Sequence, residues 1–265
     1  AKPLKWNRYA QRAGERRRVF CASLADVFED WRGPIFNHRG DELNESVIGH
    51  PPRYLTLADL RQRLYDLIDA TPWLDWLLLT KRPENIQRMW PLPPNDREPL
   101  DPLVTRRDNV WLGTSISTQE HADKQIPDLL NCRDLAPVLF LSCEPLLGPI
   151  SLDSGHSTLD QIDWVIAGGE SGPQARPMHP EWVRSLRDQC TAAGVPFFFK
   201  QWGELVPDQQ DCPLVPQGFE ADMEFATHGD QVHGVFRVGK QRAGRLLDGR
   251  EWSEFPCPVL ELESK

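Results

Sequence analysis

Two glutamates and a lysine are the residues best suited to acid–base chemistry, because each follows closely after a short apolar run. They are Glu144, Glu170 and Lys200. A carboxyl group between apolar segments can have a raised pKa, which suits it to proton transfer or to binding a hydroxyl or amine. We therefore expect these three residues to be catalytic. For Glu144 the alternative is a structural ion pair with Lys200 or Lys81.

A glycine-rich segment, GGESG at residues 168–172, contains one of these glutamates. Glycines let the backbone approach a ligand closely and expose its N–H groups. The spacing of the glycines does not match the G-x-G-x-x-G fingerprint of dinucleotide-binding proteins. We expect this loop to bind a substrate or cofactor through Gly168, Gly169, Ser171 and Arg176.

Two cations, Lys81 and Arg82, directly follow the run LLLT, and Pro83 begins a predicted short helix. Cations beside the free N–H groups of a helix start suit a phosphate or a carboxylate. Asn85 follows in the same turn and is included in this expected binding site. The alternative is that Arg82 pairs with Glu84 at the surface.

Several other polar residues follow apolar runs and could hold a nucleotide. The hydroxyls of the segment GTSIS can bind a ribose or a phosphate, although they also suit the capping of the next helix. The segment KQW offers a cation, an amide and an indole that can grip a base by stacking and hydrogen bonding. The binding residues expected from these segments and from SLAD after the first run are Ser23, Asp26, Ser115, Ser117, Gln201 and Trp202.

All of these side chains depend on six apolar runs that we interpret as strands. The runs are Val19 to Cys21, Trp76 to Leu79, Val110 to Leu112, Val138 to Leu141, Trp164 to Ala167 and Pro196 to Phe199. In a parallel α/β sheet or barrel, the residues that follow the strands meet at one rim. The pattern therefore predicts that Lys81, Ser115, Glu144, Glu170 and Lys200 converge in one cleft.

Helices are predicted between several of these strands. Leu57 to Ala70 has a core-facing stripe, and Thr56 and Asp59 form a capping-box pattern. A short helix should run from Pro83 to Trp90, followed by a loop over residues 91–102. Another should run from Ser117 or Thr118 to about Leu130, kinked or divided at Pro127. The clearest helix opens at His179-Pro180 and stops at Gly194, and the strand that follows it completes a βαβ unit.

The C-terminal part of the chain loses this pattern. We expect a partial barrel over residues 1–204 and an appendage packed on it over residues 205–265, in which only residues 232–238 resemble a strand. Because glycines recur at positions 239, 244 and 249, residues 237–250 should form a strand and loops. Lys240 and Arg245 are weak candidates for nucleic-acid contacts; the alternative is a solvated tail docked by Leu246 and Leu247.

The composition limits the class of protein. The chain has 265 residues and a net charge of −9, which argues against a protein coated with cations for non-specific nucleic-acid binding. It has no apolar run long enough to span a bilayer, so we expect a cytoplasmic protein without a membrane partner. The six cysteines lie far apart, so we expect free thiols and no metal site. The segment AKPLKW leads into the first strand, and six βα-like units are two short of a closed barrel, so an N-terminal portion could be missing.

Seven segments resemble, in the same order, a family common in bacteriophages and prophages that has no known function and is related to radical S-adenosylmethionine (SAM) enzymes. The match runs from about Lys2 to Pro256. The segments are SLADVF, LLLTKRPEN, VWLGTSIS, FLSCEPLLGPI, WVIAGGESG, FFFKQWGE and VGK-x-x-AGRLLDG.

The resemblance implies an α/β fold, an incomplete (β/α) barrel of radical-SAM type, with a rim that binds a nucleotide-like or SAM-like molecule. It implies that the complete protein would be a radical-SAM-like enzyme acting on a nucleic acid or nucleotide. Family members carry a Cys-rich loop for a [4Fe-4S] cluster upstream of the PLKW-like segment, and this chain lacks that region. We therefore expect no cofactor in this chain, and SAM and a [4Fe-4S] cluster in the complete protein only.

Two alternatives remain open from the sequence. One is a non-catalytic barrel that binds nucleic acid or a partner protein. The other is a cluster-independent enzyme that processes phosphodiesters or sugars, with Glu144 and Glu170 as acid and base. The sequence indicates neither the substrate nor the oligomeric state.

Overall fold

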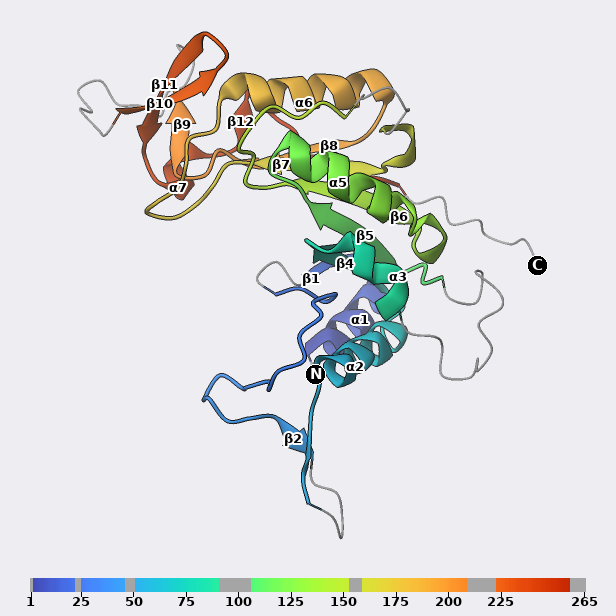
Figure 1. The fold of residues 1–265 in the computed structure, drawn as a ribbon. Coiled ribbons are helices and arrows are strands. Elements are labelled where there is room, and N and C mark those ends of the chain that lie inside the picture. Colours follow the sequence, from blue (N-terminus) through green and yellow to red (C-terminus); the bar gives the residue numbers. More distant parts are fainter. Residues whose placement is uncertain are drawn as a thin grey trace. The chain divides into compact units, whose positions relative to one another are not determined.

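A computed structural model describes residues 2–21, 25–45, 51–90, 106–152, 159–208 and 223–257. Its main feature is a parallel sheet of six strands in the order β1-β4-β5-β6-β7-β8, with helices in the connections (Figure 1). The strands are β1 (Arg17–Cys21), β4 (Leu74–Thr80), β5 (Val110–Ser115), β6 (Val138–Cys143), β7 (Trp164–Gly168) and β8 (Phe197–Gln201). The six predicted strands are therefore confirmed, as is the α/β class.

The central strands are buried along their whole length. Every residue of β5, β6 and β7 is buried, which explains why their sequences are continuous apolar runs without alternation. β7 pairs in parallel with β6 on one side and with β8 on the other. The ends of these three strands therefore lie next to one another at the same edge of the sheet.

The chain divides into two compact units, which we describe separately. Unit 1 comprises Ala1–Trp111 with Asp134–Pro137, and unit 2 comprises Leu112–Arg133 with Val138–Lys265. This division differs from the boundary near residue 204 that we predicted, which stays a prediction. None of the helices in the described ranges has the length and apolar character needed to cross a membrane.

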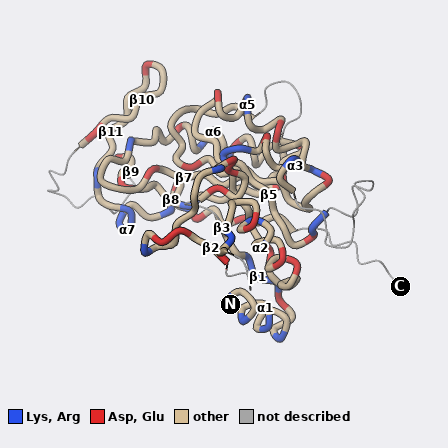
Figure 2. The backbone as a smooth tube through the Cα atoms, turned by 60° about the horizontal axis from the view of Figure 1, so that its bottom comes forward, with Lys and Arg blue, Asp and Glu red and all other residues tan. Residues whose placement is uncertain are grey.

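Unit 1 begins with a helix that the sequence analysis missed. Residues that we expected to lead into a strand form α1 (Lys2–Ala13), which packs on β1 and β4. Only Ala10 of this helix is buried, so no apolar stripe marks it in the sequence. Lys and Arg recur along it, and it has no acidic residue in its first turn (Figure 2).

The other helices of unit 1 were predicted correctly. α2 (Leu57–Asp69) has the expected capping box, in which Thr56 and Asp59 bond each other's backbone N–H groups. The short helix after β4 comprises η1 (Pro83–Asn85) and α3 (Ile86–Met89). Two short strands, β2 (Asn44–Glu45) and β3 (Arg53–Tyr54), form a separate pair. The predicted loop over residues 91–102 lies outside the described residues.

Unit 2 contains the other two predicted helices. α5 (Gln119–Leu130) is capped by Thr118 and continues through Pro127, which therefore does not divide it. α6 (Pro180–Ala193) ends at Gly194, whose φ of 70° gives the left-handed C-cap that favours glycine. Single 3₁₀ turns are η2 (Arg133–Leu135), whose last two residues belong to unit 1, and η3 (Leu159–Gln161).

The C-terminal segment of unit 2 has more regular structure than expected. β9 (Leu205–Pro207), β10 (Met223–His228) and β11 (Gln231–Arg237) form an antiparallel sheet, of which we predicted only β11. The expectation of strand and loops after it was wrong in one respect. One helical turn, α7 (Lys240–Ala243), fits between Gly239 and Gly244, and the pair β12 (Leu246–Leu247) and β13 (Arg250–Glu251) follows.

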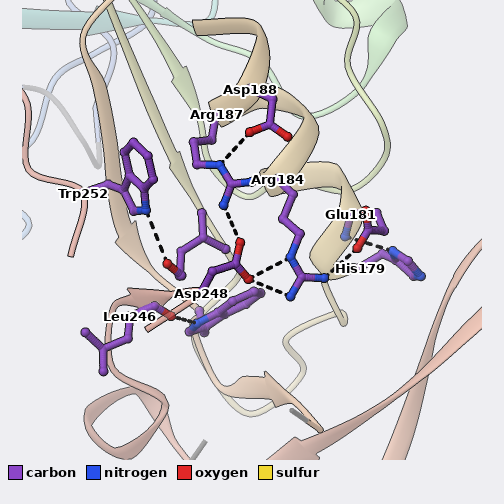
Figure 3. A network of polar contacts seen from close by, with 10 residues as sticks. His179, Glu181, Arg184, Arg187, Asp188, Leu246, Asp248 and Trp252 are labelled. Carbon is purple, nitrogen blue, oxygen red and sulfur yellow. Dashed lines mark hydrogen bonds and ion pairs between the residues drawn. The ribbon is translucent and has the colours of Figure 1, made fainter. Parts of the chain in front are cut away.

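Specific contacts hold this segment to β8 and α6. The backbone N–H of Phe199 donates to the carbonyl of Trp252 at 3.0 Å. Asp248 accepts hydrogen bonds from Arg184 and Arg187 of α6 (Figure 3). Leu247 is fully buried and docks the segment, as the alternative to nucleic-acid contact supposed, whereas Leu246 is 46% exposed.

Candidate functional site

The centre of the candidate site in unit 2 is an ion pair between Glu144 and Lys200. Glu144 follows β6 and Lys200 lies in β8, and the Nζ atom lies 3.1 Å from both carboxylate oxygens. Ser142 Oγ donates to Glu144 Oε2 at 3.2 Å. The side chain of Glu144 is 13% exposed and that of Lys200 is 46% exposed, so the pair is accessible from the side of the lysine. Of the two partners considered for Glu144, the structure shows Lys200.

The end of β5 and the residues after it are hydrogen-bonded to the segment that carries Glu144. Ser115 Oγ donates to the carbonyl oxygen of Glu144 at 3.3 Å. The carbonyl of Ser117 accepts from the N–H of Leu147 at 2.9 Å, and the N–H of Ile116 donates to the carbonyl of Ser142 at 3.0 Å. The GTSIS segment therefore positions the backbone on either side of Glu144.

The two glycines at the end of β7, Gly168 and Gly169, are closely packed inside the site. A Cβ atom on Gly168 would lie 2.8 Å from Glu144 Oε1. A Cβ atom on Gly169 would lie 1.9 Å from the carbonyl oxygen of Trp202. The end of β7 can therefore pass between Glu144 and the segment after β8 only because these residues have no side chain. This is a packing reason for the glycines, in addition to the ligand contact that we predicted.

Gln201 and Ser171 form a second polar pair close by. Gln201 Nε2 donates to Ser171 Oγ at 2.9 Å and to the carbonyl of Gly169 at 3.4 Å. The carbonyl of Gln201 accepts from the N–H of Gly169 at 3.0 Å. An amide and a hydroxyl are thereby held beside the Glu144–Lys200 pair.

Glu170 is held by Arg176 in a bidentate arrangement. Arg176 Nε lies 2.8 Å from Oε2 and Arg176 Nη2 lies 2.9 Å from Oε1, and the Arg176 N–H also donates to Oε2. These hydrogen bonds lower the pKa of Glu170 from its ordinary value, against a smaller opposite effect of burial. Glu170 is therefore a stable anion, which makes it a poor general acid near neutral pH.

Trp202 does not offer a surface for stacking. Its side chain is buried, with 4% of the residue exposed, and its ring packs edge-on against Phe199 with centroids 5.0 Å apart. The indole N–H donates to the carbonyl of Leu246 at 2.7 Å. In this conformation Trp202 anchors the C-terminal segment instead of facing a base.

A separate polar cluster in unit 1 is centred on Asp26. Its carboxylate accepts from Thr80 Oγ1 at 2.7 Å, from the N–H of Lys81 at 2.9 Å and from Arg82 Nη1 at 3.3 Å. Arg82 Nη1 also lies 2.9 Å from Glu29 Oε2. The partners of Arg82 are thus Asp26 and Glu29, and not Glu84 as the surface alternative supposed.

The remaining predicted residues of unit 1 are placed around this cluster. Asn85 Nδ2 donates to the carbonyl of Phe28 at 3.0 Å, and the side chain of Lys81 is exposed. Ser23 lies outside the described residues. Asp26 therefore joins the segment after β1 to the end of β4. Asp26 and Arg82 thus have a structural role, because their contact is part of this connection.

The two candidates for nucleic-acid contact differ in their surroundings. Lys240 is exposed at the start of α7. Arg245 Nη2 donates to Ser253 Oγ at 2.6 Å, and its guanidinium lies 4.7 Å from the centroid of the Phe198 ring. Arg245 is thereby fixed within the C-terminal segment, and Lys240 is left as the accessible cation of the two.

The contacts bring part of the predicted set together. Ser115, Glu144 and Lys200 are linked in unit 2, and Glu170 lies two residues after Gly168. Lys81 belongs to unit 1, so the common cleft of all five residues stays a prediction. The sequence analysis did not predict that Ser142 donates a hydrogen bond to the Glu144 carboxylate. The position of Ser142, two residues before Glu144 at the end of β6, could have indicated this contact.

A histidine cluster in unit 2 was also missed. The ring of His179 lies 4.7 Å from that of His233 and 5.5 Å from that of His228, measured between centroids. Burial, and after it the nearby His233 and His228, lower the pKa of His179 to about 4. Nothing in the sequence links these residues, because His228 and His233 lie about fifty positions after His179.

The cysteines of the described residues are free thiols, at positions 21, 132, 143, 190 and 257. Burial raises the pKa of Cys143 well above its ordinary value and that of Cys190 to about 12. Within the described ranges no three His, Cys, Asp or Glu side chains are grouped so that they could hold a metal ion. Cys143 and Cys190 are therefore inert, protonated groups of the core, whereas Cys257 is exposed.

Comparison with known proteins identifies a family but no characterised relative. Neither the curated proteins nor the solved structures gave a match. Residues 56–256, well over half of the chain, match the model of a family described as "Protein of unknown function (DUF5131)". The chain therefore belongs to the DUF5131 family.

Proposed function

We propose that the Glu144–Lys200 site binds a nucleotide-like or SAM-like small molecule. The single observation that carries the proposal is the Nζ–carboxylate distance of 3.1 Å, at a point where the lysine is nearly half exposed. A carboxylate and an ammonium side by side complement a ligand that carries both an amino group and a carboxylate. The methionine part of SAM has this pair of charges.

Neighbouring groups support the same proposal. Gln201 and Ser171 supply an amide and a hydroxyl for a ribose or an amide-bearing base. Arg176, with 59% of its side chain exposed, can approach a phosphate while it still holds Glu170. Binding would use groups that already have partners, so the ligand must replace the contact between Glu144 and Lys200.

The resemblance to a phage-type family related to radical-SAM enzymes extends this proposal to the complete protein. On that basis the complete protein would be a radical-SAM-like enzyme that modifies a nucleic acid or nucleotide. The described residues of this chain do not fit a [4Fe-4S] cluster, because Cys143 and Cys190 lie near each other but no third thiol of the described ranges is grouped with them. Three thiolates would have to meet at one point.

The other two functions receive less support from the geometry. An enzyme that uses Glu144 and Glu170 as acid and base needs one carboxyl group that stays protonated, whereas Arg176 keeps Glu170 ionised. If the protein is a non-catalytic module, it should bind nucleic acid or a partner protein without any turnover. Iron and sulfide analysis of the longest natural form of the protein would separate it from a radical-SAM-like enzyme.

Calorimetric titration of the purified chain with SAM, S-adenosylhomocysteine and ATP tests the proposal. Glu144→Gln and Lys200→Met should each weaken the binding of SAM about ten-fold or more, since each removes one charged partner. Glu120→Gln and Lys124→Met change the same residue types at exposed positions of α5 and serve as matched controls. The proposal would be refuted if the chain bound none of the three ligands. It would also be refuted if the control variants lost as much affinity for SAM as the site variants.

A further inference from the structure

The first helix exposes aromatic and basic side chains together. Trp6 is 42% exposed and Tyr9 is 46% exposed, although large aromatic residues are usually buried. The ammonium of Lys5 lies 5.5 Å from the centroid of the Tyr9 ring. A partially exposed aromatic ring with a cation over it is a surface on which a further planar group could stack.

The first helix and the residues just after it are positively charged, although the whole chain is negatively charged. Residues 2–18 contain seven Lys or Arg and a single acidic residue, Glu15, whereas the whole chain has a net charge of −9. Figure 2 shows the Lys and Arg positions spaced along α1. Of these cations, Arg16 is paired with Asp75 and belongs to the packing of unit 1. Arg16 lies beyond the end of α1, and the four cations within α1 are exposed.

The attachment of α1 fixes which of its faces points outward. Ala10 is fully buried, and Asn7 Oδ1 accepts a hydrogen bond from the N–H of Trp73 at 2.8 Å. On a helix of about 3.6 residues per turn, the side opposite these two residues carries the exposed positions. Lys5, Tyr9 and Arg12 lie on that side, and Lys2 and Trp6 follow them around the helix towards Ala10, so that the five exposed positions span an arc of about 120°.

The distribution of apolar groups favours nucleic acid over a membrane. A helix that lies in a bilayer surface needs one continuous apolar face. Here Leu4 lies about 200° around the helix from Trp6, and cations separate the aromatic positions. Interleaved cations and aromatic rings are instead what single-stranded nucleic acid requires, since phosphates bind the cations and bases stack on the rings.

We propose that the outward face of α1, formed by Lys2, Lys5, Trp6, Tyr9 and Arg12, binds single-stranded nucleic acid. The cations supply affinity without sequence preference, and the two rings supply stacking. This surface belongs to unit 1 and uses none of the residues of the Glu144–Lys200 site in unit 2, so the proposal goes beyond the proposed small-molecule binding and does not depend on it.

Fluorescence anisotropy with a labelled oligothymidylate and an oligouridylate, measured over a series of KCl concentrations, tests the proposal. The triple variant Lys2→Gln, Lys5→Gln and Arg12→Gln should bind at least about ten-fold more weakly at low salt. The slope of the logarithm of the binding constant against the logarithm of the KCl concentration, called the salt slope below, should fall in magnitude by about 2. Each phosphate contact to a single strand contributes about 0.7 to this slope. The double variant Trp6→Leu and Tyr9→Leu should lose affinity and keep the salt slope, because stacking releases no counterions.

A control variant with the same change in net charge separates a site from general electrostatics. Arg32, Arg39 and Lys124 are exposed elsewhere, and their replacement by Gln should leave the affinity within about two-fold. Circular dichroism checks that each variant keeps its helix content. An equal loss in the control variant, or no oligonucleotide binding by the unmodified chain, would overturn the proposal. Binding of the chain to vesicles with anionic lipid but not to oligonucleotides would also overturn it in favour of a membrane surface.

Discussion

The ammonium of Lys200 and the carboxylate of Glu144 meet at 3.1 Å although β7 lies between the strands that carry them. The two side chains reach each other over the end of β7, where Gly168 has no side chain to obstruct them. The geometry of the ion pair is therefore set by the ends of three adjacent parallel strands, of which β6 and β7 are buried along their whole length. A site built on strand ends in this way is held more precisely than one built on free loops.

Substitution of the two glycines should reveal how tightly this arrangement is packed. Gly169→Ala should lower the free energy of unfolding by about 3 kcal/mol or more, because its Cβ would meet a backbone oxygen at 1.9 Å. Gly168→Ala should cost about 1–2 kcal/mol, because the carboxylate of Glu144 can shift. Gly148→Ala is the control, since no atom lies within 4 Å of its added Cβ. Urea unfolding measures all three, and an order other than Gly169, Gly168, Gly148 would contradict this account.

The interaction of Glu170 with Arg176 should be visible in the titration of its carboxyl group. Its pKa is lowered from 4.5, mainly by the hydrogen bond to Arg176, so the carboxylate should stay ionised throughout the range from pH 5 to pH 8. Arg176→Met should raise the pKa towards 4.5. Carbon-13 NMR of labelled glutamate side chains measures both values. A Glu170 pKa near neutrality in the unmodified protein would instead support a role as general acid.

The central strands β5, β6 and β7 could be predicted because their burial is continuous. In β6 and β7 every side chain faces the interior, so each strand is an unbroken apolar run that ends where polar chemistry begins. The helix α2 could be predicted from Thr56 and Asp59 because a capping box is a local interaction. These features depend on short stretches of sequence, which is why they needed no tertiary information.

The features that were missed depend on contacts between distant residues. α1 buries only Ala10, so its attachment through Asn7 and Trp73 leaves no periodic apolar signal. Trp202 follows a strand like the site residues, but Leu246 binds its indole N–H and makes it part of the core. A residue type that suits a ligand equally suits packing, and only the fold distinguishes the two.

The buried histidine of α6 should make the stability of unit 2 depend on pH. The pKa of His179 is lowered from 6.5 to about 4, so the folded chain keeps it neutral while the unfolded chain protonates it below about pH 6.5. The stabilising contribution is therefore complete above pH 6.5 and is lost as the pH falls from 6.5 to about 4. The groups that face His179 are His228, His233, Glu181 and Arg184.

His179→Asn tests this pH dependence without removing the helix cap. The Nδ1 atom of His179 accepts from the N–H of Glu181 at 3.2 Å, and asparagine can accept the same bond as a preferred N-cap residue. Between pH 6 and pH 4.5, the free energy of unfolding of the variant should change less steeply with pH than that of the unmodified protein. The difference in slope should be up to about 1.4 kcal/mol per pH unit, which is the contribution of one proton. Urea unfolding at several pH values measures the slope. An unchanged slope would mean that other groups cause the pH dependence.

Asp248 should be the residue through which α6 holds the C-terminal segment. Arg184 Nη2 lies 2.8 Å from Oδ1 and Arg187 binds Oδ2, while the backbone of Asp248 has a φ of 53°, in the left-handed region (Figure 3). Asp248→Asn keeps a residue that tolerates this conformation and removes the charge, so it should cost about 1–2 kcal/mol. Asp248→Gly favours the same conformation and also removes the contact, whereas Asp248→Ala adds the backbone strain and should cost about 1 kcal/mol more than Asp248→Gly. Hydrogen exchange should then rise at the N–H groups of Phe199 and Glu254, which pair β8 with this segment. If exchange there stays unchanged in all three variants, the hydrogen bonds to β8 hold the segment without help from α6.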